Sequence, residues 1–137
     1  MEPTENSPFA HDHYTDVLRA DIDANNHANN IVYLRWVQDA ATNHWQTAVP
    51  AHIANPHTWV VVRHEIDYKK AAYLGDRIRV HTWVATMSAL TSERHCRIYR
   101  DSDNTLLASV KTRWCSINPA TARPSRLDPR IPACFGL

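Results

Sequence analysis

The stretch that decides the fold runs from residue 21 to residue 36 and reads Asp-Ile-Asp-Ala-Asn-Asn-His-Ala-Asn-Asn-Ile-Val-Tyr-Leu-Arg-Trp. Its first ten residues are almost all polar, and the residues after them begin an apolar pattern with helical spacing. Asn29 or Asn30 stands where a helix N-cap belongs, because an amide oxygen accepts hydrogen bonds from the free N–H groups of a first turn. A carboxylate, an amide and an imidazole at the positive end of a helix dipole indicate a hydrolytic centre.

Asp, Asn and His are also the ordinary residues of loops and caps, so each of them alone has a structural interpretation. Five polar residues nevertheless exceed what the cap of one helix needs. Asp23, Asn25 and His27 alternate with Ala24 and Asn26. In an extended chain, alternate side chains point to the same side. We therefore expect these three side chains to face one point.

A second pattern predicts one long apolar helix that begins at Ile31 and is stopped by Pro50. Apolar side chains recur every three or four residues, at positions 31, 34, 37, 41, 45 and 48. Tyr33, Trp36 and Ala40 widen this apolar side, which indicates a helix enclosed by other structure. About eighteen residues at ~1.5 Å each give a rod of ~27 Å.

The rest of the chain reads as strands. The alternation of apolar and polar residues predicts strands over 59–68, 77–87, 91–100 and 106–117, with a hairpin loop over 101–104. In the last of these strands we expect one side to carry Leu106, Ala108, Val110 and Trp114. Before the polar cluster, 1–12 is predicted as a loose lead-in and 13–20 as a first strand. The Pro-rich tail, 119–137, is predicted to have little regular structure.

Short connections make consecutive strands antiparallel neighbours. The apolar face of such a sheet needs cover, and the predicted helix provides it. We therefore expect an α+β fold in which an antiparallel sheet of about five strands curls round one long central helix. The edge strands remain open, which favours pairing into a homodimer or a homotetramer.

Length and composition limit the class of protein. The 137 residues suit a single domain over 1–137. A net charge of +1 provides neither a basic surface for nucleic acid nor a polybasic membrane patch. No apolar run approaches the ~20 residues of a membrane helix, and the N-terminus lacks the features of a signal peptide. With three widely spaced cysteines that indicate reduced thiols, we expect a cytoplasmic protein.

The nine histidines do not form a recognisable metal site. His11 and His13 are closely spaced but lie at the predicted lead-in, and no His-Glu-x-x-His motif is present. Side chains of His64 and Glu65 point to opposite faces of a strand. With only two glycines, the chain has neither a nucleophile elbow nor a phosphate-binding loop. We therefore expect no metal and no cofactor.

Residues 21–33 resemble the pattern Asp-x-Asp-x-x-x-His-x-Asn-Asn-x-x-Tyr of the hot-dog fold thioesterases. The resemblance is to the branch that contains 4-hydroxybenzoyl-CoA thioesterase and the plant-type fatty acyl-ACP thioesterases. The later Glu-Ile-Asp-Tyr-Lys-Lys-Ala-Ala of 65–72, followed by Gly75-Asp76, is similar to the second strand and turn of this family. The similarity extends over 13–130.

What the resemblance implies is hydrolysis of an acyl thioester carried by CoA or by acyl carrier protein. Asp23 matches the catalytic carboxylate, which acts as nucleophile or as general base toward water. Asn25 and His27 match residues that assist this carboxylate and orient the water. The backbone N–H at Asn30 matches the donor of the oxyanion hole, and Tyr33 matches a substrate-binding position.

The chain departs from the family pattern at several positions. Asn26 stands where many relatives have Gly, so either the loop differs in shape or Asn26 adopts a left-handed conformation. Ala71 and Ala72 replace an acidic residue and a Cys of some acyl-ACP enzymes, and the turn 88–90 lacks the basic residues that certain relatives use for CoA phosphates. Two alternatives stay open: a hot-dog hydratase that adds water to a C=C bond, and a non-catalytic acyl-binding protein.

Overall fold

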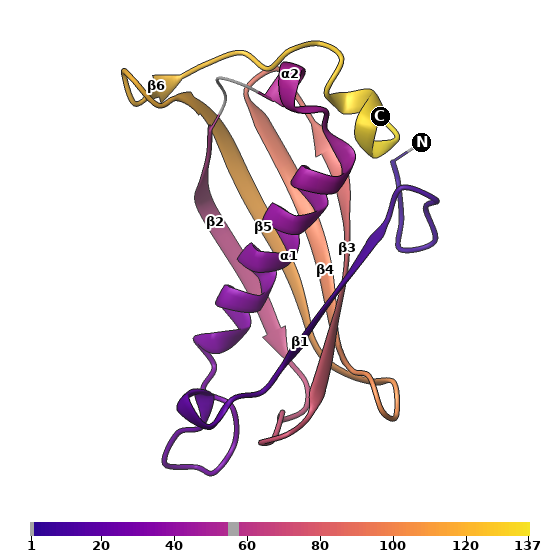
Figure 1. The fold of residues 1–137 in the computed structure, drawn as a ribbon, viewed down its shortest axis with the longest axis vertical. Helices are drawn as coiled ribbons and strands as arrows, with labels where there is room; N and C mark the ends of the chain where they lie inside the picture. Colours follow the sequence, from indigo (N-terminus) through magenta and orange to yellow (C-terminus); the bar gives the residue numbers. More distant parts are fainter. Residues whose placement is uncertain (1, 55–57) are drawn as a thin grey trace.

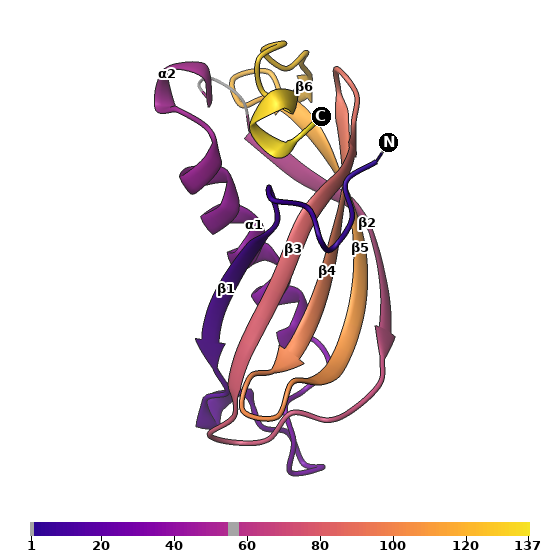
Figure 2. The same ribbon diagram turned by 90° about the vertical axis from the view of Figure 1, so that its right-hand side faces the viewer.

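The computed structural model describes residues 2–54 and 58–137. It shows an antiparallel sheet that curves round one long helix, α1 (Val32–Ala48), as Figures 1 and 2 show from two sides. The long strands are β1 (His11–Asp16), β2 (Thr58–Tyr68), β3 (Arg77–Met87), β4 (Thr91–Arg100) and β5 (Thr105–Asn118). The strand order is β1-β3-β4-β5-β2, and the short β6 (Arg123–Pro124) pairs with β5. This confirms the predicted α+β architecture of about five strands round a central helix.

The apolar side of α1 packs against the inner face of the sheet. Trp36, Val37 and Ala40 are fully buried there, against Ile78 and Ile98 of the sheet. A second apolar cluster lies at the C-terminal end of α1. It consists of Val49, Ile53, Val84, Leu127, Ile131 and Phe135, so it combines the short α2 (Ala51–Ala54) with the C-terminal segment. The enclosure of the helix by other structure is therefore as predicted.

The first strand and the lead-in differ from the prediction. The strand begins at His11, inside the predicted lead-in, and ends at Asp16, because β1 pairs with β3 from His11 opposite Thr82 to Asp16 opposite Arg77. The chain then enters a 3-10 turn, Arg19–Asp21. The Asp21 carboxylate stabilises this turn by accepting a hydrogen bond from the Leu18 N–H at 2.9 Å. A side chain that bonds to a nearby backbone group competes with the strand ladder.

The last long strand carries a register shift that the alternating pattern does not reveal. Ile98 lies opposite Ala108 and Tyr99 opposite Leu106, so Leu107 is an extra residue on β5. Such a bulge shifts the alternation of side chains by one position. Leu107 is therefore fully buried and Leu106 is not, in contrast to the predicted inward face, which is correct for Ala108 and Val110.

The Pro-rich tail is more ordered than predicted. It contains β6 and a 3-10 turn, Pro132–Phe135, which begins with a proline as helical turns often do. Phe135 is buried in the second apolar cluster. Gly136 follows with a φ of 83°, and a Cβ added there would lie 2.6 Å from a ring carbon of Phe9. The C-terminal turn therefore packs directly on the N-terminal segment.

Within the part of the chain that the structure describes, no helix combines the length and the apolar character needed to cross a bilayer.

Candidate functional site

The polar loop 23–30 leads into the beginning of α1, at the lower end of the helix in Figure 1. Ile22 and Ala28 form an isolated antiparallel bridge that closes the loop. Inside it, the Asp23 N–H donates to the His27 carbonyl at 3.1 Å, and the Ala28 N–H donates to the Ala72 carbonyl at 2.8 Å. The loop is thus a closed turn that is fixed to the segment before β3.

The predicted alternation of Asp23, Asn25 and His27 is not realised, because this segment is a turn and not an extended chain. The Asp23 carboxylate accepts a hydrogen bond from the Asn25 N–H at 2.8 Å, and the Asp23 carbonyl accepts one from the Asn26 N–H at 3.0 Å. Asn26 has a φ of 62°, so it adopts the left-handed conformation that was one of the two expectations. The turn therefore joins Asp23 to the backbone of Asn25 and of His27, and the convergence of the three side chains stays a prediction.

A second carboxylate of the motif anchors the loop. Asp21 is only 3% exposed. Its two oxygens accept hydrogen bonds from the Arg35 guanidinium on α1, at 2.8 and 3.0 Å. The hydrogen bond from Arg35 is the main reason why the pKa of Asp21 lies below its ordinary value. The Asp21 carbonyl also accepts the Asn29 N–H at 2.9 Å, so Asp21 connects both sides of the loop.

The beginning of α1 offers a free donor. The Asn29 side chain accepts a hydrogen bond from the Ile31 N–H at 3.1 Å, and the Asn29 carbonyl accepts the Val32 N–H at 2.9 Å. Among the described residues, the Asn30 N–H has no hydrogen-bond partner. The Asn30 carbonyl accepts a hydrogen bond from the Tyr68 hydroxyl at 2.9 Å, which fixes the residue on β2. Asn29, not Asn30, therefore satisfies a helix-start N–H with its side chain.

His27 and Tyr33 occupy different surroundings. The Nδ1 atom of His27 lies 3.1 Å from the Ala28 carbonyl. A carbonyl only accepts, so Nδ1 donates there, and Nε2 is the ring nitrogen left for another partner. Tyr33 is 2% exposed and donates to the Lys70 carbonyl at 3.5 Å. The Tyr33 ring packs on the Tyr68 ring with centroids 5.2 Å apart. The substrate-binding role of Tyr33 stays a prediction.

Two cavities of the described chain lie away from this loop. The larger has a volume of about 220 Å³ and lies between the C-terminal half of α1 and the inner face of the sheet, and the other, of about 170 Å³, involves Trp83 and His95. None of the predicted site residues lines either of them. From Asn30 to Thr42 in the wall of the larger cavity, the helix rises by ~18 Å. The loop is therefore open at the surface of the single chain.

Sequence reasoning did not identify two polar residues that β4 contributes to the larger cavity, Arg94 and Ser92. Both belong to the alternating pattern of β4, on the side that faces the core together with Cys96 and Ile98. A charged residue at an inward position of an alternating strand was the signal that could have identified Arg94. Among the described residues, no group of three or more His, Cys, Asp or Glu side chains is arranged to hold a metal ion.

Comparison with known families agrees with the resemblance that the sequence shows. Residues 17–135 match the thioesterase-like superfamily. The chain belongs to this superfamily. Because its members are thioesterase-like, membership supports thioester hydrolysis in general. A comparison with curated proteins found no match.

Solved structures show that this member has the hot-dog fold. The 1,4-dihydroxy-2-naphthoyl-CoA thioesterase from Synechocystis is similar with a TM-score of 0.80 and 18% identity, over 93% of this chain and 96% of that chain. The corresponding enzyme from Staphylococcus aureus has a TM-score of 0.81 and 20% identity, over 90% of this chain and 85% of that chain. Another Staphylococcus aureus protein, solved in complex with CoA, has a TM-score of 0.80 and 17% identity, over 91% and 80% of the two chains.

Proposed function

We propose that the protein hydrolyses an acyl-CoA thioester at the loop 23–30. The observation that carries this proposal is the free N–H of Asn30 at the beginning of α1, in the same closed loop as the Asp23 carboxylate. A free backbone N–H at a helix start is suited to stabilise an oxyanion. CoA is preferred over acyl carrier protein because one similar structure was solved with CoA.

In the proposed mechanism, the thioester carbonyl oxygen binds at the Asn30 N–H. Asp23 either attacks the carbonyl carbon directly, with water hydrolysing the resulting anhydride, or removes a proton from an attacking water. His27 and Asn25 orient this water. In the direct route the C–S bond breaks and the thiolate leaves as the anhydride forms, and the later attack of water on the anhydride supplies the proton of the thiol. In the general-base route water adds first, the C–S bond then breaks, and the proton held by Asp23 passes to the thiolate.

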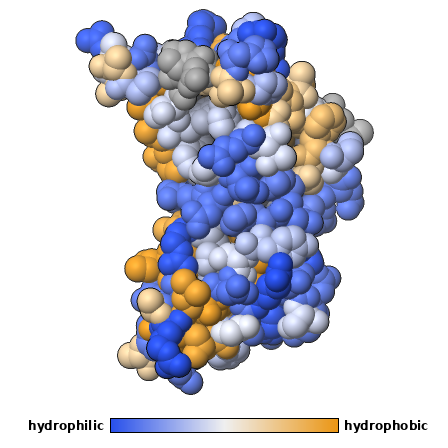
Figure 3. Space-filling model, viewed as in Figure 1, coloured by the Kyte–Doolittle hydropathy of each residue, from blue (hydrophilic) through white to orange (hydrophobic). Residues whose placement is uncertain are grey.

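The site also requires a second copy of the chain in this proposal, because none of the loop's predicted site residues lines either of the two cavities described above. Strand β2 is an edge of the sheet, and its Val60 and Val62 are exposed. Figure 3 shows hydrophobic residues along the margin where β2 and the beginning of α1 lie in Figure 1. Open edges with apolar side chains favour pairing. We infer a homodimer, alone or within a homotetramer, formed by two β2 strands.

Antiparallel pairing of two β2 strands about a twofold axis has a direct consequence for the site. It reverses α1 relative to the partner's helix. The loop 23–30 of one chain then lies near the C-terminal half of α1 of the other chain. The larger cavity is in that half, so the acyl group has a place to bind. The free thiols Cys96, Cys115 and Cys134 fit a reducing, cytoplasmic location for this enzyme.

The test is the variant Asp23→Asn, measured by thiol release from a panel of acyl-CoA esters. We expect kcat/KM to fall by about 100-fold or more, because the general base or nucleophile is removed while the side chain keeps its shape. The matched control is Asp39→Asn, which removes a carboxylate from the exposed side of α1 and should retain full activity. Full activity of Asp23→Asn would contradict the role of Asp23, and turnover of enoyl-CoA alone would indicate a hydratase.

A further inference from the structure

The larger cavity contains a buried positive charge without a carboxylate partner. Arg94 is 5% exposed. Its guanidinium donates to the Thr82 hydroxyl at 3.0 Å and to Nδ1 of His44 at 2.9 Å. Among the described residues, no carboxylate lies within 4.0 Å of it. Its ionisable hydrogen-bond partner, His44, is neutral, because burial above all lowers the pKa of His44 to about 3.

Arg94 nevertheless remains charged near neutral pH. Burial lowers its pKa to about 10, which is still well above 7. An unpaired charge in a protein interior is costly, and buried charges are normally paired. The fork of a guanidinium matches a carboxylate with two parallel hydrogen bonds. The Arg94 guanidinium in the wall of this cavity is therefore suited to bind an anion.

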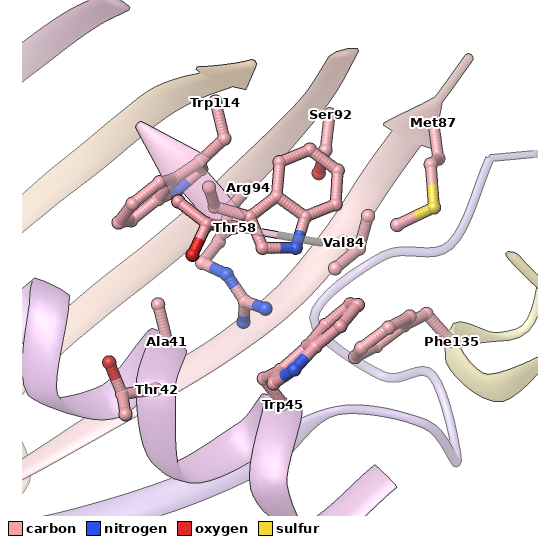
Figure 4. Close-up of a pocket in the computed structure, with 11 residues that line it drawn as sticks. Ala41, Thr42, Trp45, Thr58, Val84, Met87, Ser92, Arg94, Trp114 and Phe135 are labelled. Atoms are coloured by element: carbon pink, nitrogen blue, oxygen red, sulfur yellow. The ribbon is translucent and has the colours of Figure 1, made fainter. Parts of the chain in front are cut away.

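The other walls of the cavity are mainly aromatic. Trp45, Trp59 and Phe135 line it. Trp45 meets Trp59 edge to face with ring centroids 5.9 Å apart, and stacks on Phe135 at 6.0 Å. Figure 4 shows the Arg94 guanidinium extending from the sheet toward α1, into the space beside Ala41 and Trp45. An aromatic enclosure with one cation suits a flat ring with an anionic substituent.

A second polar group that lines the cavity lacks a hydrogen-bond partner among the described residues. The indole N–H of Trp114 is buried and has no hydrogen-bond acceptor in the described structure. Buried polar groups in native proteins are nearly always satisfied, so this N–H also needs an acceptor. The volume of about 220 Å³ fits one ring with a substituent, since a cavity of roughly 150 Å³ already accepts benzene.

We propose that this cavity binds an aromatic carboxylate, whose carboxylate accepts hydrogen bonds from Arg94 and whose ring lies among Trp45, Trp59 and Phe135. The Trp114 N–H donates to a further oxygen of the same ligand. The ligand has two possible sources. It is either a free aromatic acid or the carboxylate-bearing acyl group of a CoA thioester, and only the second source rests on the proposed function.

The first arm of the test uses the unmodified protein and direct binding. Benzoate, benzamide and cyclohexanecarboxylate are titrated by calorimetry, with the quenching of tryptophan fluorescence as a second readout. We expect benzoate to bind at least about 10-fold more tightly than benzamide, because hydrogen bonds to a charged group are the stronger ones. Equal affinity for benzoate and benzamide, or no saturable binding of benzoate, would overturn the proposal.

The second arm uses Arg94→Met, with Arg97→Met as the matched control on the same strand. Arg97 pairs with Glu5 at 3.3 Å and is partly exposed, so its loss should leave binding unchanged. Arg94→Met should weaken benzoate by about 10- to 100-fold and leave benzamide nearly unaffected. If Arg94→Met does not fold, Arg94→Lys replaces it, and should keep the preference for the anion with reduced affinity. Loss of benzoate binding in Arg97→Met, or full binding in Arg94→Met, would contradict the site.

The third arm distinguishes the two sources. Hydrolysis is compared for a benzoyl thioester with and without a carboxylate on the ring. If the acyl group is the ligand, Arg94→Met lowers kcat/KM for the carboxylated thioester by about 10-fold or more and not for the plain one. If a free acid is the ligand, benzoate binds but the two thioesters respond alike. Either result supports the cavity as an anion site, and failure in direct binding overturns it whether or not the thioesters are cleaved.

Discussion

Asp21 and Asp23 stand two residues apart in one motif, yet the structure gives them different surroundings. Asp21 is buried and receives two hydrogen bonds from Arg35. Asp23 is half-buried and accepts a bond from the Asn25 N–H. One carboxylate therefore holds the loop on α1, and the other is the candidate for chemistry. The family pattern contains both carboxylates, but the resemblance implied a role only for Asp23.

Replacing the anchoring carboxylate should destabilise the protein. We expect Asp21→Asn to lower the free energy of unfolding by about 1–3 kcal/mol at pH 7, because a charged hydrogen-bonded pair is lost. Since the folded pKa of Asp21 is depressed, its contribution is present above the unfolded value of ~3.9 and is lost as the pH falls through the lower folded value. Urea denaturation at neutral and acid pH measures this. If the unfolding free energies of wild type and variant differ by the same amount at every pH, the assignment is contradicted. Asp39→Asn serves as the control.

His44 should make stability depend on pH. Burial, with a smaller effect of the Arg94 charge, lowers its pKa to about 3. Between that value and ~6.5, the unfolded chain binds a proton that the folded protein does not. The contribution of His44 is thus present above ~6.5 and lost as the pH falls. We expect His44→Gln to reduce the pH slope of the unfolding free energy by up to ~1.4 kcal/mol per pH unit, whereas His52→Gln, at an exposed position, should not.

At the scale of elements, the loop before α1 depends on one left-handed residue. Asn26 has a φ of 62°, a conformation that Gly and Asn adopt at lower cost than other residues do. We expect Asn26→Ala to lower the free energy of unfolding by about 1 kcal/mol and Asn26→Gly to leave it unchanged or raise it. Thermal denaturation checks this, with Asn25→Ala as the neighbouring control for stability. Equal effects of Ala and Gly at this position would show that strain is not the cause.

The elements differ in how well the sequence predicted them. Helix α1 and strands β3 and β4 were predicted nearly to the residue, because their repeats are long and end at clear turn signals. The bulge at Leu107 was not, since an inserted residue leaves no trace in composition. The short elements of the tail have no repeat of their own, since β6 depends on pairing with β5 and the turn Pro132–Phe135 depends on packing in the second apolar cluster.

On the scale of the whole molecule, the proposed dimer gives a direct prediction. We expect the double variant Val60→Lys and Val62→Lys to be monomeric, because charged lysines on an edge strand oppose pairing. Val62 is 57% exposed in the single chain, so the variant should still fold. Light scattering after gel filtration measures the mass, and thiol release should fall together with it. The control is Tyr14→Lys on β1, the opposite edge.

The candidate site was predictable only in part at this scale. Its loop is continuous in sequence, so a motif of thirteen residues was enough to identify it. The cavity is assembled from residues between 41 and 135 that converge only in the fold. Such convergence depends on strand order and register, which a single sequence does not specify. The place of Arg94 in the wall of this cavity therefore follows only from the fold.

The contact between Phe9 and Gly136 ties the far ends of the chain together, and it matters for how the protein is handled. Phe135, the residue just before Gly136, forms one wall of the larger cavity. Removal of the first nine residues would delete Phe9, which packs on the C-terminal turn, and the turn would then fray. Accidental proteolysis during purification would then change ligand affinity without touching any lining residue, so intact mass should be checked before each titration.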